Sequence, residues 1–248
     1  DNITRFKAAR YSPVLYVKKD MREQLAQELE EKTGIKFGLL IGRQTNVSSF
    51  MRHLLVSRFE SSMAAFQTSL GYMIQSAEHL LTWIDKRHKI PVYKKGNLPE
   101  VDDFYTDDGM EEIQETFDKY ESRGFFEIDM KYVEDNFIED VKTDIHLLQS
   151  LREEWFGKEN VIKQDPKLDS FIEIAKKKLE QEPERKLIVF SEYADTVDYL
   201  GKKLVEAGLP VMKYTSADAS PNNKERIRAN FDAGLKKEIQ RDDYKILV

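Results

Sequence analysis

The chain has 248 residues, of which 40% are hydrophobic and 34% are charged, and its formal net charge is −6. This composition excludes a wholly disordered chain, and the length suits one large domain or two small ones. The sequence contains no cysteine, which excludes disulfides and cysteine-based zinc sites and agrees with the cytoplasmic location that we expect.

The termini and the apolar stretches carry no targeting signal. The first ten residues, DNITRFKAAR, lack a Met and an apolar signal segment, so we expect the chain to begin inside a longer protein. The longest uncharged stretch, Ser61 to Ala77, is too rich in Ser, Thr and Gln to span a bilayer. We therefore expect no membrane partner.

The charges are unevenly distributed. Residues 100–145 hold 17 acidic and 4 basic residues, a net of −13, so the rest of the chain has a net charge of +7. Because attraction between charges is screened over about 10 Å at ordinary salt, the local excess matters more than the total. A basic part of this chain can therefore meet an anionic partner although the whole is acidic.

The first 45 residues predict short elements. RYSPVLYVKK, residues 10–19, is predicted to be extended around Pro13. MREQLAQELEEKTG, residues 21–34, predicts a helix that ends at Gly34. KFGLLIG, residues 36–42, is compatible with either a helix or a strand.

The middle of the chain has a helical pattern. From Asn46 to Ile84, apolar residues at three- and four-residue spacing predict one long helix, or two helices interrupted near Gly71. Residues 86–109 predict a loop, because they contain two prolines, two glycines and a change from basic to acidic charge.

Two further helices are predicted before the end of this region. They are expected around Met110 to Glu121 and around Met130 to Trp155, and Gly157 closes the second. Residues 1–162 are thus predicted to be a mainly helical region.

From Asp165 onward, helical and strand patterns alternate strictly. Three strands that alternate with helices predict an α/β fold in which a parallel sheet is flanked by helices. The last predicted strand reaches the final residue, so we expect the chain to stop within the sheet. The predicted strands are Lys186 to Phe190, PVMKYTS at 210–216 and KILV at 245–248. The first predicted helix has an apolar face from Leu168 to Leu179, and the second runs from Ala194 to Ala207 and stops at Gly208. The third begins at Ser220 and Pro221 and ends at Gly234.

Polar residues follow the first two of these strands, at the sheet edge where ligands bind in such folds. Ser191, Glu192 and Tyr193 follow the first strand, and Thr215 and Ser216 end the second. We expect these residues to be exposed. A hydroxyl beside the backbone N–H groups of a helix start can bind a phosphate, although Ser191 could instead simply cap the next helix.

Four segments occur in the order and spacing of a known protein family. They are QDPKLDSFIEIAKKKL, KLIVFSEYADTVDYLGKKL, GLPVMKYTSADASPNNKERIRANFDAG and DYKILV. Residues 163–248 thereby resemble the second RecA-like lobe of superfamily-two helicases, closest to Swi/Snf-type DNA translocases and their bacterial relatives. KLIVFSEY resembles motif four, and KILV resembles the strand that opens motif five. RFKAARYSP and FMRHLLVSRFESSMAAF resemble segments between the two lobes of such proteins.

The resemblance implies a role for particular residues. It implies that Ser191 and Tyr193 contact nucleic-acid phosphates or the edge of the nucleotide, and that Arg52 and Arg58 couple the two lobes. Local alternatives are packing for Tyr193, an ion pair of Arg58 with Glu60 or another carboxylate, and simple solvation for the helical basic residues. The complete nucleic-acid-binding set is Ser191, Tyr193, Thr215, Ser216, Lys224, Arg226 and Arg228.

One departure from the family concerns the second strand. A glycine commonly follows it, whereas here Tyr214 is followed by Thr215, Ser216 and Ala217. Without this glycine, the close approach of the loop backbone to DNA that the family implies is in doubt.

The family's ATP-hydrolysing residues are not found in this sequence. It has no GxxxxGK[ST] phosphate loop and no DExx box between suitable strands, and the arginine motif is expected after Val248. The resemblance implies ATP and Mg²⁺ as cofactors of an intact protein whose first lobe precedes Asp1. We expect no cofactor and no ATPase activity for this chain by itself.

Other readings of the sequence are less specific. The four histidines lie apart from one another without metal-ligand spacing, and DDFYTDDG, residues 102–109, departs from the Ca²⁺-binding loop by one position. A small-molecule Rossmann enzyme is disfavoured because no GxGxxG follows a strand. The principal alternative is a non-catalytic α/β and helical module whose acidic helices bind a protein partner.

Overall fold

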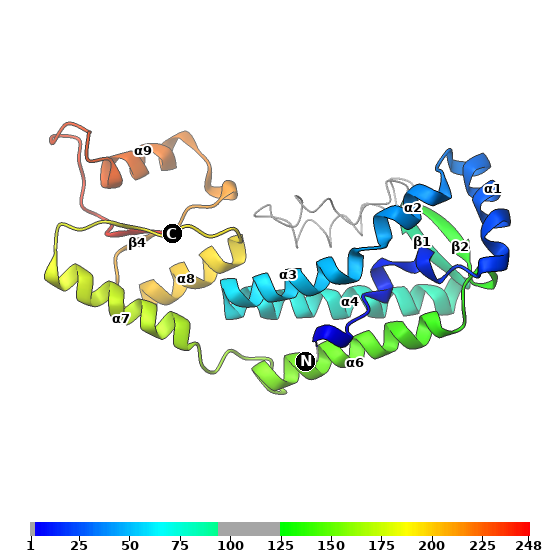
Figure 1. The fold of residues 1–248 in the computed structure, drawn as a ribbon. Coiled ribbons are helices and arrows are strands. Elements are labelled where there is room, and N and C mark those ends of the chain that lie inside the picture. Colours follow the sequence, from blue (N-terminus) through cyan, green and yellow to red (C-terminus); the bar gives the residue numbers. More distant parts are fainter. Residues whose placement is uncertain (1–2, 94–124) are drawn as a thin grey trace. The chain divides into compact units, whose positions relative to one another are not determined.

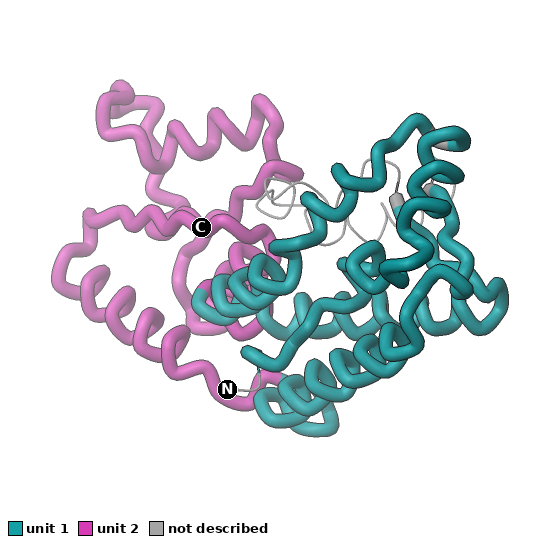
Figure 2. Tube along the Cα trace, turned by 45° about the vertical axis from the view of Figure 1, so that its right-hand side comes forward, with its two compact units in different colours: residues 1–60, 66–104, 109–161 teal, residues 61–65, 105–108, 162–248 magenta. Residues whose placement is uncertain are grey.

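The computed structural model describes residues 3–93 and 125–248. This part of the chain is mostly helical and contains two small sheets, which agrees with the mixed α/β class (Figure 1). It divides into two compact units (Figure 2). Unit 1 comprises the described residues up to Glu60, from Phe66 to Tyr93 and from Phe125 to Val161, and unit 2 comprises Ser61–Ala65 and Ile162–Val248.

Unit 1 consists of helices and one pair of strands. Phe66 of α4 makes edge and tilted ring contacts with Phe59 of α3, at 5.2 Å, and Phe156 of α6, at 6.1 Å, so one aromatic side chain joins the three long helices. Its helices are α1 (Arg22–Thr33), α2 (Phe37–Gln44), α3 (Val47–Ser61), α4 (Met63–Arg87) and α6 (Asn136–Phe156), and its strands are β1 (Lys89–Tyr93) and β2 (Phe125–Asp129).

The break between the two long helices lies at Ser62, so the prediction of an interruption near Gly71 is wrong. The Ser62 hydroxyl accepts a hydrogen bond of 3.0 Å from the Ala65 N–H, which caps the start of α4. Gly71 lies inside α4, where a glycine weakens a helix without ending it.

The prediction of a loop from residue 86 is also wrong for its first residues. Helix α4 continues to Arg87, and β1 pairs with β2 in an antiparallel register that places Ile90 opposite Ile128. Both isoleucines are fully buried, so the strand forms because its apolar side chains reach the core. The remainder of that loop, and the helix predicted around Met110 to Glu121, lie outside the described residues.

Two other predictions for unit 1 need correction. Residues 10–19 are mostly wound into short 3-10 turns, η2 (Ala9–Tyr11), η3 (Pro13–Tyr16) and η4 (Lys19–Met21), and the chain is extended at Val17, between η3 and η4. The helix predicted from Met130 begins only at Asn136, because β2 and the turn η5 (Met130–Tyr132) occupy the preceding residues.

Unit 2 contains a parallel sheet in the order β3-β5-β4. Its strands are β3 (Leu187–Ile188), β4 (Val211–Met212) and β5 (Ile246–Leu247), and its helices are α7 (Pro166–Gln181), α8 (Ala194–Glu206) and α9 (Pro221–Phe231). Helices α7 and α8 cover one face of the sheet, and α9 lies over the other (Figure 1). The alternation predicted from the sequence is therefore confirmed, with shorter strands than expected.

The core of unit 2 lies on the face covered by α7 and α8. Ala175, Val197, Leu204 and Ile246 are buried there, and Leu187 and Val189 pack against them. The opposite face of β3 is open, because Ile188 is 50% exposed and Phe190 is 90% exposed. The segment from Leu187 to Phe190 is therefore buried only on the side that faces α7 and α8.

Candidate nucleic-acid interface

The carboxyl ends of the three strands of unit 2 lie side by side. The Val189 N–H donates to the Leu247 carbonyl at 2.8 Å, and the Tyr214 N–H donates to the Val248 carbonyl at 2.9 Å. These two bonds join the ends of β3 and β4 to the end of β5 between them. We call the residues just after these ends, 190–193 and 214–218, the strand-tip rim.

The rim brings residues far apart in the sequence to one edge. Neighbouring strands are about 4.8 Å apart, so the outer strands β3 and β4 are separated by roughly 10 Å. Ser191 and Ser216 follow these two outer strands, so both lie at the carboxyl edge of the sheet.

Ser191 is half-buried and belongs to a tight turn. Its hydroxyl accepts the N–H of Tyr193 at 3.3 Å, and the N-cap position of α8 belongs to Tyr193. The Ser191 hydroxyl therefore stabilises the backbone turn that leads into α8, two residues before its N-cap. The hydroxyl also donates to the Tyr193 carbonyl at 3.4 Å, so its one donor is used within this turn and a phosphate would have to replace that bond.

Tyr193 differs from the expectation for exposed polar residues. Its side chain is only 3% exposed, so the prediction of an accessible phenol at this edge is wrong. Its carbonyl accepts the N–H groups of Thr196 and Val197, at 3.1 and 3.2 Å, in the first turn of α8. These contacts make Tyr193 part of the local framework of the rim.

Thr215 and Asp218 form a closed pair next to the end of β4. Asp218 Oδ2 accepts both the N–H and the hydroxyl of Thr215, each at 2.9 Å. These two bonds hold the pKa of the Asp218 carboxyl below its usual value. Thr215 is only 8% exposed, so the prediction of exposure is wrong here too, whereas Ser216 is exposed on the turn η6 (Ser216–Asp218).

The basic residues of α9 are exposed, as their helical pattern predicted, but their surroundings differ. Lys224 lies in the first turn of α9, close in sequence to the rim. Arg226 donates to the Tyr244 hydroxyl at 2.5 Å and lies over its ring. Arg228 is 3.9 Å from an Asp232 carboxylate oxygen. Lys224 is therefore the cation best placed to extend the rim.

Asn230 holds the segment before β5 against α9. It is 4% exposed, and its side-chain oxygen accepts the N–H groups of Asp243 and Tyr244, at 2.8 and 3.2 Å. Sequence reasoning missed this residue, since an asparagine in a polar helix carries no sign of a partner thirteen residues away. It positions Tyr244, and thereby Arg226, on the surface of α9.

Arg52 and Arg58, implied to couple two lobes, both lie on α3 in unit 1. Arg52 donates to the carbonyl oxygens of Thr4 and Phe6, at 3.2 and 3.1 Å. Arg58 is 4% exposed and donates to the Ser69 hydroxyl at 2.8 Å. Both contacts lie inside unit 1, where these guanidinium groups join α3 to the N-terminal segment and to α4.

The described residues contain no metal-binding cluster and no membrane-spanning helix. In residues 3–93 and 125–248, no group of three or more His, Cys, Asp and Glu side chains is arranged to hold a metal ion. No helix in these ranges is long and apolar enough to cross a membrane. No protein-family model, no curated protein and no solved structure matches this chain.

Proposed function

We propose that this chain is part of an ATP-dependent DNA translocase or helicase, in which unit 2 supplies most of the second motor lobe. The observation that carries the proposal is the strand-tip rim, where parallel strands end together on Ser191, Thr215 and Ser216. Ligands of open α/β sheets bind at this edge. The order of the four sequence segments supports the same assignment.

The role of the rim is to bind the nucleic-acid backbone irrespective of base sequence. The Ser216 hydroxyl is exposed for a neutral hydrogen bond. The start of α9 is joined to the same turn by the Asn223 side chain, which donates to the Asp218 carbonyl at 2.9 Å, and the next residue, the exposed Lys224, supplies a positive charge. Contacts to phosphate of this kind position a protein on nucleic acid without reading bases. They release counterions, so the affinity falls steeply as salt rises.

ATP would supply the energy for movement in the intact motor. The residues of this chain do not fit a complete nucleotide site, because the sequence lacks a phosphate loop. We therefore assign no step of hydrolysis to this chain. Its own residues bind the strand and hold the rim in shape through the Thr215–Asp218 pair.

The proposal is tested by DNA binding measured as fluorescence anisotropy of a labelled oligonucleotide over roughly 50 to 200 mM salt. We expect binding that is similar for two unrelated sequences. The double variant Lys224→Gln and Arg228→Gln should lower the slope of log affinity against log salt by about 2, since each lost phosphate contact contributes about 0.9.

The matched control removes the same charge from another face. Lys176 and Lys177 are exposed on α7, so Lys176→Gln with Lys177→Gln should leave the slope unchanged. Equal effects of the two double variants would show that only the net charge matters and would reject the rim as the binding surface. Absence of salt-dependent binding would reject the proposal itself.

A protein-interaction module remains the second candidate, and one observation favours it. Phe190 is 90% exposed and Ile188 is 50% exposed on the same side of β3. Apolar side chains exposed together are typical of surfaces that contact another protein. This candidate would be supported over the first if the chain does not bind DNA but captures a protein partner, and if the variant Phe190→Ser no longer captures that partner.

A further inference from the structure

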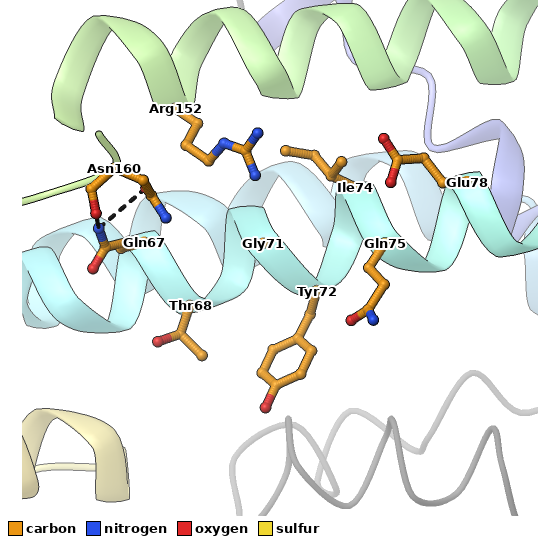
Figure 3. A pocket seen from close by; sticks show the side chains of 9 residues that line it. All are labelled: Gln67, Thr68, Gly71, Tyr72, Ile74, Gln75, Glu78, Arg152 and Asn160. Carbon is orange, nitrogen blue, oxygen red and sulfur yellow. Dashed lines mark hydrogen bonds between the residues drawn. The ribbon is translucent and has the colours of Figure 1, made fainter. Parts of the chain in front are cut away.

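Unit 1 contains a hollow along α4, far in sequence from the strand-tip rim (Figure 3). Its cavity volume is about 460 Å³, within the range of about 300–1,000 Å³ for small-molecule sites. Its floor is one face of α4, and residues of α6 and the following loop complete it.

Arg152 of α6 lies in this hollow with its guanidinium group above α4 (Figure 3). Its side chain is half-buried, and it has no hydrogen bond or ion pair within the described ranges 3–93 and 125–248. A guanidinium has five N–H donors in a planar fork that matches a carboxylate or phosphate. Within the described part of the chain, Arg152 is therefore a donor group without a partner, in a hollow large enough to hold a ligand.

Asn160 adds a second donor next to Arg152. Its backbone is left-handed, at a φ of 51°, and Gln67 of α4 holds it there by donating to both its carbonyl and its side-chain oxygen, at 2.6 and 3.1 Å. Because the oxygen of the Asn160 side chain is bonded to Gln67, its NH₂ group is left as a donor. One side of the hollow is thus rich in N–H groups (Figure 3).

At Gly71, no side chain projects from α4 into the hollow. A Cβ atom placed on Gly71 would meet no atom within 4 Å, so this glycine borders open space. A larger side chain at this position would fill the hollow. The same position gives a way to block the hollow without removing any charge.

Glu78 lies two turns further along α4 and gives the hollow an acidic end. Its carboxylate accepts the Gln149 side-chain N–H at 3.2 Å. A negative charge at Glu78 repels an anion bound at Arg152. The site therefore favours a ligand whose anionic group is confined to one end.

We propose that this hollow binds a small phosphate-bearing molecule whose phosphate meets Arg152 and the Asn160 amide. Phosphate fits the fork of the guanidinium, and the room beyond it fits the rest of an ester. The inference does not depend on the function proposed for unit 2.

The test is an NMR titration of the whole chain, following the Arg152 side-chain N–H and the Gly71 amide. The probes are inorganic phosphate and adenosine 5′-monophosphate, each added alone. We expect both signals to shift, and Arg152→Gln to weaken phosphate binding by at least about tenfold, because a charge-assisted bond is lost. Glu78→Gln should strengthen binding, since it removes the opposing charge.

Two further variants separate the hollow from general charge and from misfolding. Lys158→Gln removes an equal charge from an exposed residue that lies six positions after Arg152 and does not line the hollow, so it should leave binding unchanged. Gly71→Leu should abolish binding while the circular dichroism spectrum stays helical.

Three outcomes would overturn the proposal. They are equal losses for Arg152→Gln and Lys158→Gln, full binding by Gly71→Leu, and no response to either phosphate probe. A DNA oligonucleotide forms the last arm of the experiment. Shifts at Arg152 with DNA but with neither small probe would assign the site to a nucleic-acid phosphate and reject the small ligand.

Discussion

Asp144 shows how one buried carboxylate can determine the path of a distant segment. It is 2% exposed and accepts the backbone N–H groups of Lys7 and Ala9, both at 2.8 Å. Ala8 between them is left-handed, at a φ of 54°, which turns both N–H groups toward the same carboxylate. The N-terminal turns of unit 1 are therefore held by a residue more than 130 positions later.

Replacement of Asp144 by Asn should destabilise the protein. The amide offers one acceptor oxygen where the carboxylate offers two, so one buried N–H loses its partner at a cost of about 1–3 kcal/mol. Urea unfolding at neutral pH measures the change. The exposed Glu139→Gln on the same helix is the control and should alter the free energy of unfolding by less than about 0.5 kcal/mol; equal effects would contradict the role given to Asp144.

Burial raises the pKa of Asp144, although the two N–H bonds oppose the shift. A carboxyl whose pKa is higher in the folded state favours folding most below its unfolded pKa, near 3.9. Its contribution declines as pH rises from there through the folded pKa. Asp218 has the opposite sign, because the Thr215 bonds lower its pKa.

Asp218 therefore gives a prediction for acid conditions. Its stabilising contribution is complete above the unfolded pKa of about 3.9 and is lost as pH falls through the lower folded value. Asp218→Asn should lower the free energy of unfolding by about 1 kcal/mol at pH 7, since charged hydrogen bonds to Thr215 become neutral. The difference from the unmodified protein should shrink below about pH 4 in urea titrations; a difference that does not change with pH would contradict this account.

Helix α4 carries a glycine where the fold does not require one. Gly71 lies in the helix interior with open space around its Cβ position, so Gly71→Ala should stabilise the protein by about 0.5–1 kcal/mol. Thermal unfolding should show a rise of a few degrees.

Gly34 provides the contrasting case at the end of α1. Its φ is 71°, a left-handed conformation that costs an alanine about 1–2 kcal/mol. Gly34→Ala should therefore lower the unfolding temperature. A fall for both variants would contradict the placement of Gly71 inside a regular helix.

The elements that could be predicted are those set by local chemistry. Gly34, Gly157 and Gly208 all have a positive φ at the helix ends where their spacing placed them. Ser220 accepts the Asn223 N–H at 3.2 Å and begins α9 before Pro221, as the sequence predicts. Each of these signals acts within four residues, so it can be recognised without tertiary structure.

The elements that could not be predicted depend on distant partners. Strand β1 forms against β2, and Val17 bridges to Val133. A local sequence pattern cannot identify which distant strand or residue will pair with a given segment. In the candidate site, the alternation of strands predicts where the rim lies, but the burial of Tyr193 and the Thr215–Asp218 pair depends on tertiary packing.

For the chain as a whole, we predict no ATPase activity when it is assayed alone. The sequence has no phosphate loop, and an arginine finger of this class can contribute a factor of roughly 10³–10⁵ to turnover. A phosphate-release assay with and without DNA measures this. Turnover above background that persists after repeated purification would contradict the motor assignment as we have drawn it.

The central claim is that the nucleic-acid backbone binds along the strand-tip rim of unit 2. Backbone amide NMR shifts on addition of a short DNA strand locate the surface directly. We predict chemical-shift changes concentrated at residues 190–193, 214–218 and Lys224. The changes for residues of α7 should be smaller than the width of their signals. Shifts confined to unit 1, or no shifts at all, would contradict the claim.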